Sequence, residues 1–580
     1  MLNNQFVLEA CWLLFTIILL SFSGISFVLL VMPNAKFRLL ASPFVGMLLL
    51  TLFTTACYIG FRMNFHNAIL ISYIVLIFSS GVTVFALRKK SIGRMEIIQF
   101  LFVFLIGALI FTWLCNYASV ISNGPSISYL DGTDHIGYAN LADWMVGNQV
   151  AERLPALSAP FANSVNPYEQ LPNLMINWEP RIGAFAWLSI VSEIRSLPAV
   201  FAYDPACAIA LSVSIIGIAA IFCETWVGIA ILSIGLLGCH WIEFGHSGYF
   251  GKMLAYPSIL FIIGLFVRSG VNRLVFPLVL LAASSGILLS GFVTGAFIFL
   301  FCGLIVLNEF RLKGRIDWKS ANTLLTLVFV AIAADGLFVH PSNRGFPQNY
   351  LDYIDLAGRA LDIVGWTSGP SYPNWLMCIL IITMLVTSVF FGWLARNSGE
   401  IMVLLFSPVI IFIILLPLQS PILLQLSGLI YPSILCGAIL FGQKTGNKYG
   451  YIGALVMVVL TSFHTESVIA RYATGHSVGI FTKQEIDSLA KAVGNKTVLI
   501  DVSGNPQLAL ILMAEFGRRN IDIQWSEKDW YTVAGGWRKW PVPSYATKAS
   551  FLISQQDGSQ QKPGHFNIFS IPVTNGIQPN

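Results

Sequence analysis

Apolar segments of about 20 residues follow one another along this chain from residue 8 to residue 468. A hydrocarbon layer is about 30 Å thick and a helix rises about 1.5 Å per residue, so each segment can cross a bilayer. Of the 580 residues, 56% are apolar and only 11% are charged. Because so few charges cannot cover the surface of a soluble globule, the sequence predicts a polytopic α-helical membrane protein with about 14 transmembrane helices.

Basic residues concentrate in alternate short loops, and this pattern predicts the orientation of the helices. The positive-inside rule assigns loops rich in Lys and Arg to the cytoplasm. The basic loop residues are Lys36, Arg38, Arg88, Lys89, Lys90, Arg94, Arg268, Arg273, Arg311, Lys313, Arg315, Lys319, Arg396, Lys444 and Lys448. The amino terminus and three polar segments, residues 116–203, 340–374 and those after 464, are then extracytoplasmic. The net charge of +5 is spread over separate loops, which excludes a nucleic-acid-binding protein.

The predicted helices and loops divide the chain into four regions. Residues 1–115 form amino-terminal transmembrane helices, and residues 116–203 form the first large periplasmic loop. Residues 204–468 form further transmembrane helices, with a second periplasmic loop at 340–374. Residues 469–580 differ in pattern, because helical spacing over 483–493 and 506–518 alternates with apolar strands at 497–502 and 521–525. This alternation predicts a C-terminal extracytoplasmic α/β domain.

A short run of carboxylates directly follows the fourth predicted transmembrane helix. Residues 131–145 read DGTDHIGYANLADWM, in which Asp131, Asp134 and His135 lie within five positions of one another. Asp131 would be the N-cap of a helix, and Asp134 would lie favourably near the positive end of its dipole. The same group beside a bilayer also suits a general base or a divalent cation site, so structural and catalytic roles both remain open.

The residues from Asp134 onward also match a known pattern. The run DHIGYANLADWM resembles the D-x-x-x-Y-A-x-x-A-x-x-M motif that opens the first large external loop of polyprenyl-phosphate-sugar transferases of the GT-C fold. Lipid A aminoarabinose transferases and protein O-mannosyltransferases are examples of these enzymes. The resemblance implies a GT-C-like fold, with Asp134 as catalytic base and Asp131 beside it. It also implies activity without a metal or other cofactor, whereas the residues alone leave open a divalent cation at Asp131 and Asp134.

A second run, WEPRIGAFAWL at residues 178–188, resembles the segment in which a basic residue beside proline faces the lipid phosphate in these enzymes. Here Arg181 follows Pro180, where a lysine commonly precedes the proline. Arg181 is accordingly a candidate phosphate-binding residue. Further cations on the predicted outer side, which would stabilise charge on a departing phosphate, are Lys252, Arg344 and Arg359.

Other polar side chains near these cations are candidate substrate ligands. Glycines in the short external loop at residues 245–256 permit close backbone approach, although a simple helix-connecting turn would have the same composition. The candidate substrate-binding residues are His135, Tyr138, Glu179, His246 and Tyr256. Asp143, like Glu179, is either a helper in acceptor binding or a solvated loop charge.

These residues lead to one hypothesis and two alternatives. The hypothesis is an inverting glycosyltransferase that moves a sugar from a polyprenyl phosphate to a cell-envelope glycan, glycolipid or protein, on the periplasmic face of a bacterial inner membrane. One alternative is an O-antigen polymerase or ligase with a polyprenyl-diphosphate donor, whose phosphates Arg344 and Arg359 would bind. The other is a transporter or lipid flippase, but the predicted spans are almost free of charge apart from Asp335.

Overall fold

The structure is a computed structural model of the 580-residue chain. The residues that it describes are 4–33, 35–87, 92–129, 134–147, 182–239, 241–246, 250–269, 374–395, 398, 401, 404–405, 422–473, 479–501, 511–512, 515–519, 521, 523–525, 551–555 and 566–570.

Among the described residues, five helices are long and apolar enough to cross a membrane. They are α1 (Asn4–Val31), α2 (Arg38–Gly60), α3 (Phe65–Ala86), α4 (Arg94–Cys115) and α9 (Ala199–Phe222). Large side chains on α3, such as Phe78 and Phe85 at 73% exposure each, face outward as lipid-facing residues do. These helices indicate a membrane protein, as the sequence predicts, while the total of about 14 spans stays a prediction.

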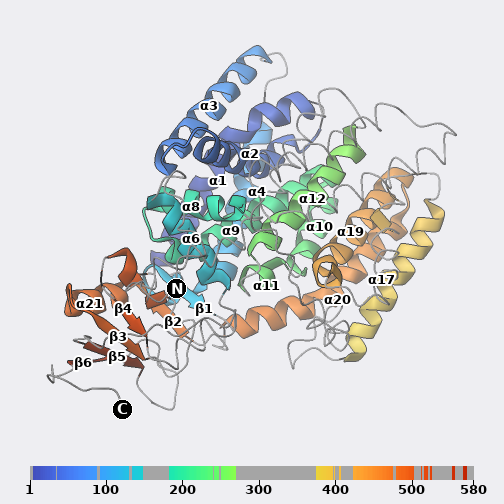
Figure 1. Cartoon of the computed structure of the whole chain (residues 1–580). Coiled ribbons are helices and arrows are strands. Elements are labelled where there is room, and N and C mark those ends of the chain that lie inside the picture. The colour runs from blue at the N-terminus through green and yellow to red at the C-terminus, as the bar shows by residue number, and fades with distance from the viewer. Residues whose placement is uncertain are drawn as a thin grey trace.

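The other described helices surround or extend this set (Figure 1). They are α5 (Tyr117–Ser122), α6 (Asp134–Gly147), α8 (Ile182–Arg195), α10 (Trp226–Leu237), α11 (Trp241–His246), α12 (Phe250–Ser269), α17 (Asn374–Leu394), α19 (Ile422–Thr445), α20 (Lys448–Ala473) and α21 (Lys483–Val493). Helix α9 is the centre of the arrangement, because all 24 of its residues are buried. Helix α10 has only 12 residues, so at about 1.5 Å per residue it is too short to cross a bilayer alone.

Charged side chains join the helices at two opposite ends. At one end Arg38, at the start of α2, lies 3.3 Å from Glu96 at the start of α4. At the other end the buried carboxylate of Glu9, in the first turns of α1, accepts two hydrogen bonds from Arg195 at 2.6 and 2.8 Å. Glu9 also accepts from Asn116, which directly follows α4, at 3.2 Å. The starts of α2 and α4 therefore lie together at one end of the helices, and the start of α1 and the end of α4 lie together at the other. The predicted alternation of loops between two sides requires this grouping.

Small residues let α1 and α2 approach closely. Gly24 and Gly46 face the partner helix, and a Cβ added at Gly46 would collide with the backbone carbonyl of Leu20. The hydroxyls of Ser21 and Ser42 form a hydrogen bond of 2.6 Å across the same contact. Close backbone approach of this kind stabilises helix pairs in membranes, where apolar burial contributes little.

We expect Gly46→Ala to destabilise the folded protein by about 1–3 kcal/mol, because the added methyl group overpacks the α1–α2 contact. Gly81→Ala, in α3, is the matched control, since a Cβ at Gly81 meets nothing within 4 Å. Thermal unfolding of the two variants in detergent measures the difference. Equal melting temperatures would contradict the close contact.

Two short strands join parts of the chain that are far apart in sequence. Strand β1 (Ser126–Tyr129) pairs antiparallel with β2 (Gly479–Thr482), with Ser126 opposite Thr482 and Tyr129 opposite Gly479. The backbone N–H of Lys483 extends this ladder with a bond to the carbonyl of Pro125 at 2.9 Å. The segment that leads to Asp134 is thus attached to the last part of the chain.

We call residues 479–570 the C-terminal region. In addition to β2 it contains a four-stranded sheet. The strands are β3 (Val498–Asp501), β4 (Ile523–Trp525), β5 (Phe551–Gln555) and β6 (Phe566–Ser570), in the order β4-β3-β5-β6. Strand β3 is parallel to β4 and β5, and β6 is antiparallel to β5. Figure 1 shows this sheet and α21 beside β1 and β2. The predicted helix at 483–493 and the strands β3 and β4 are confirmed, while a separate α/β domain stays a prediction.

Candidate functional site

Helix α6 carries the predicted base and is buried nearly all round. Tyr138, Ala139 and Ala142 have no exposed surface, and Asn140 is 2% exposed. The spacing of Tyr138, Leu141, Ala142 and Met145 in the sequence indicates one apolar face, so the burial is wider than this pattern predicts. Asn140 was missed as a site residue, although neither its side-chain nitrogen nor its oxygen has a hydrogen-bond partner in the described part of the chain. Such a buried amide calls for a water molecule or a ligand group.

Two tyrosines contact both ends of the connection between α11 and α12, which is shorter than the predicted loop at residues 245–256 because α12 already begins at Phe250. The hydroxyl of Tyr138 accepts from the backbone N–H of Gly251 at 3.3 Å, and the hydroxyl of Tyr203, in α9, donates to the carbonyl of Gly245 at 2.7 Å. Their rings lie 5.5 Å and 4.9 Å from the ring of Phe250. Tyr203 was missed as a site residue, because its contacts form only when α9 packs against α11 and α12.

These contacts link the helix that begins at Asp134 to the helix that contains Lys252. Asp134 is the first residue of α6 and lies one turn before Tyr138, so helical spacing puts both positions on one face. Lys252 is partly buried and directly follows Gly251 at the start of α12. Tyr138 and Gly251 are 113 residues apart in the sequence. The chain positions of the predicted base and of a predicted phosphate-binding lysine thus lie at neighbouring helix starts.

The other predicted site residues fall into three groups. Tyr138 and Tyr256 are packed in the core at 0% and 1% exposure, so in this structure they support the helices, and their contact with substrate stays a prediction. The side chains of Asp134, His135 and His246 lie outside the described residues, although α6 and α11 contain their backbones. Five further residues lie wholly outside the described part of the chain: Asp131, Glu179, Arg181, Arg344 and Arg359.

The described residues contain no group of three or more His, Cys, Asp and Glu side chains that could hold a metal ion. Asp131 is outside these residues. A divalent cation at Asp131 and Asp134 therefore stays a prediction.

Asp143 lies near the end of α6 and caps a neighbouring helix. Its Oδ1 accepts from the backbone N–H of Ala199, the first residue of α9, at 2.8 Å. Pro198, the N-cap residue of α9, makes no side-chain cap hydrogen bond, so Asp143 supplies the missing acceptor from another helix. Burial raises the pKa of Asp143 to about 7; the Glu515 carboxylate adds to this rise, whereas the Ala199 N–H and the Arg518 guanidinium oppose it.

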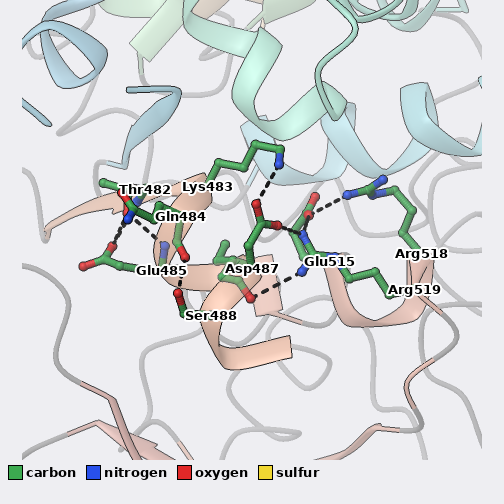
Figure 2. Close-up of polar contacts among 10 residues, drawn as sticks. Thr482, Lys483, Gln484, Glu485, Asp487, Ser488, Glu515, Arg518 and Arg519 are labelled. Carbon is green, nitrogen blue, oxygen red and sulfur yellow. Dashed lines mark hydrogen bonds and ion pairs between the residues drawn. The ribbon is translucent and has the colours of Figure 1, made fainter. Parts of the chain in front are cut away.

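Glu515 belongs to a network of charges in the C-terminal region (Figure 2). Its Oε2 accepts from Arg518 at 3.0 Å and from Arg519 at 3.4 Å, and its side chain has no exposed surface. Arg519 also pairs with Asp487, which lies 2.7 Å from Lys483. Burial alone would raise the pKa of Asp487, but the hydrogen bonds from Lys483 and Arg519 outweigh it and hold the pKa below its ordinary value.

An open cavity of about 330 Å³ lies between this network and the turn before β1. It is lined by Pro125, Lys483, Gln484, Asp487, Ser488 and Lys491. The N–H groups at the start of α21 are already satisfied by a capping box of Thr482 and Glu485, so they offer no anion site. The cavity is a solvent-facing hollow where the C-terminal region meets the loop after α5.

Comparisons of the chain with protein-family models, with curated proteins and with solved structures find no match. The resemblance of residues 134–145 to the transferase motif therefore depends on those residues alone.

We expect Asp143→Ala to lower the free energy of unfolding by about 1 kcal/mol, because α9 loses the acceptor for its first N–H. Asp143→Asn keeps an acceptor oxygen and is the matched control.

The pKa of Asp143 rises on folding from its ordinary value of 3.8 to about 7, so its contribution to stability falls as pH rises through that window. Melting temperatures of wild type should show this fall between pH 5 and pH 7.5, and Asn at position 143 should reduce it. Equal pH slopes in the two proteins would contradict a raised pKa at Asp143.

Proposed function

We propose that this chain is an integral-membrane glycosyltransferase of the GT-C type. It transfers a sugar from a polyprenyl-phosphate donor to a cell-envelope glycan, glycolipid or protein acceptor, with inversion at the anomeric carbon. Asp134 is the general base, and Lys252 helps to bind the donor phosphate.

The observation that carries this proposal is the hydrogen bond between the Gly251 N–H and the Tyr138 hydroxyl. It links α6, one turn after Asp134, to the first turn of α12, which contains Lys252, so a carboxylate position and a cation position belong to the starts of two helices in contact. Transfer from a lipid phosphate needs both groups there. The base takes the proton of the incoming hydroxyl, and in the same displacement the cation stabilises the charge on the leaving phosphate.

The proposed reaction is a single displacement. The carboxylate of Asp134 takes the proton of an acceptor hydroxyl, and the acceptor oxygen forms a bond to the anomeric carbon. The bond between that carbon and the phosphate oxygen breaks, and the polyprenyl phosphate leaves with the electron pair. Lys252, together with Arg181, Arg344 and Arg359, would stabilise the negative charge on the leaving phosphate.

The pairing of β1 with β2 supports a common location for the motif and the C-terminal region. Together with the basic loops, it favours a bacterial inner-membrane protein of about 14 spans whose C-terminal α/β domain is periplasmic.

Asp134→Asn should lower the rate of sugar transfer by a factor of about 100 or more, because the amide cannot accept the acceptor proton. The assay uses purified protein, a polyprenyl-phosphate sugar and an envelope extract as acceptor. Glu224→Gln is the matched control, since Glu224 is exposed in the turn between α9 and α10, at the other end of α9. An unchanged rate in Asp134→Asn would remove Asp134 as the base, and solute flux without an acceptor would favour a transporter.

Lys252→Gln should lower kcat about tenfold or more while melting stays within a few degrees of wild type, because a cation near the leaving phosphate acts mainly in the transition state. Lys448→Gln is the control, since Lys448 is exposed at the start of α20, in a loop that the sequence predicts to lie on the opposite side of the membrane from Lys252. A product ladder from diphosphate-linked repeat units would instead indicate a polymerase, and equal rates in the two variants would exclude Lys252 from phosphate binding.

A further inference from the structure

Helix α10 ends among the packed helices, and the chain continues after a short break as α11. Gly238 and Cys239, in the break, are buried, and their backbone N–H groups bond to the carbonyls of Gly235 at 3.1 Å and Leu236 at 3.3 Å. A Cβ added at Gly238 would lie 2.7 Å from the hydroxyl oxygen of Thr461 in α20. Irregular backbone at membrane depth is tolerated where protein covers it, so this break depends on the helices packed against it.

Trp241, the first residue of α11, bonds to a carbonyl that a proline deprives of its helical donor. Its indole Nε1–H donates to the carbonyl of Gly428 in α19 at 2.9 Å, and Trp241 has no exposed surface. Pro432 lies four residues after Gly428 inside α19 and has no N–H, so the regular helical bond to this carbonyl cannot form. Neighbouring helices supply the partners of such carbonyls in membranes. Trp241 has this role here, and its bond fixes the start of α11 against α19.

The end of α11 is fixed on another side, against α9 and α12. The carbonyl of Gly245 accepts from the hydroxyl of Tyr203 in α9 at 2.7 Å. A Cβ added at Gly245 would lie 2.9 Å from the Sδ of Met253 in α12 and 3.3 Å from the Sγ of Cys207 in α9. Met253 directly follows Lys252 in the sequence. The backbone of α11 therefore packs directly on the first turn of α12, beside which it lies (Figure 1).

Helix α11 has only six residues, so it is a short, stiff connection between these two contacts. A shift of its start relative to α19 would also shift Gly245 against Met253, because a single helix of this length moves as one piece. In a packed interior such a shift is transmitted to the neighbouring side chains, since there is little empty space to absorb it.

We infer that Trp241 is a positioning residue: through its bond to Gly428 it holds α11 in place, and α11 in turn holds the start of α12 and thereby Lys252. The accuracy matters because an error of about 1 Å in the position of a catalytic group can lower a rate about 100-fold. The effect on Lys252 rests on the proposed function, whereas the hold on α11 and on the start of α12 does not.

Hydrogen exchange of the full chain in lipid nanodiscs, without any sugar donor, tests this hold. Trp241→Phe keeps an aromatic ring but removes the N–H. The protection of the Gly251 N–H, which bonds to Tyr138, should then fall about tenfold, the usual size of the loss of one buried hydrogen bond. Protection in α2 should equal that of wild type. If Trp241→Phe does not fold, benzothienylalanine at position 241, in which sulfur replaces the N–H, gives the same test at nearly unchanged side-chain volume.

Pro432→Ala is the matched second variant, because it gives position 432 an N–H that can bond to the Gly428 carbonyl within α19. In Trp241→Phe combined with Pro432→Ala the carbonyl is satisfied again, but α11 still lacks its bond to α19, so the protection of Gly251 should stay low. Recovery of that protection would overturn the inference, because Trp241 would then serve only to satisfy Gly428. No fall at Gly251 in Trp241→Phe, or an equal fall in α2, would overturn it as well.

The sugar-transfer assay tests whether Trp241 acts through Lys252. Trp241→Phe should lower kcat about tenfold in the chain with Lys252 but about twofold or less in Lys252→Gln, because a residue that positions Lys252 has nothing to position there. Equal losses in the two backgrounds would overturn the role through Lys252. A chain in which Trp241→Phe lowers the protection of Gly251, but whose wild type transfers no sugar, would keep the hold on α12 and lose the proposed function.

Discussion

The antiparallel pairing of β1 with β2 is the contact on which the arrangement around Asp134 depends. It is short, but its backbone hydrogen bonds are directional, and they fix which residue of the 126–129 segment faces which residue of 479–482. A membrane helix can slide or rotate slightly against its neighbours, whereas a strand ladder has one register. The segment that follows α4 therefore leaves the transmembrane helices in a defined direction before α6 begins.

From that point α6 is held by packing on most of its circumference. Tyr138 contacts Phe185 of α8 at 5.1 Å between ring centroids and Phe250 of α12 at 5.5 Å, and Ser189 donates to the carbonyl of Ala142 at 3.0 Å. Buried helices are rigid because every side chain has neighbours at van der Waals distance. A catalytic group at the start of such a helix gains accuracy of position, which is the property that a displacement on an anomeric carbon demands.

The sequence predicts this protein well where the signal is local. Apolar run length gives the helices α1 to α4, and Thr482 and Glu485 mark the start of α21, where the structure has a capping box. Partners distant in the sequence leave no such mark. Neither the β1–β2 pairing nor the bond of Tyr203 to Gly245 can be predicted from one of its two segments alone. The strands β5 and β6 were not predicted. Apolar run length also does not mark the break between α10, which ends at Leu237, and α11, which begins at Trp241.

Asp143 shows most clearly why residue type alone could not assign the site. A carboxylate in a polar loop reads as a solvated charge or a substrate ligand, and its helical spacing from Asp134 carries no further information. Only the tertiary structure shows that Pro198 leaves the first N–H of α9 without a local cap and that Asp143 lies within 2.8 Å of it. Burial of this carboxylate makes its charge costly and raises its pKa to about 7, with the Glu515 carboxylate adding to the rise. Asp143 is therefore assigned as a cap of α9 by its place between packed helices and not by its residue type.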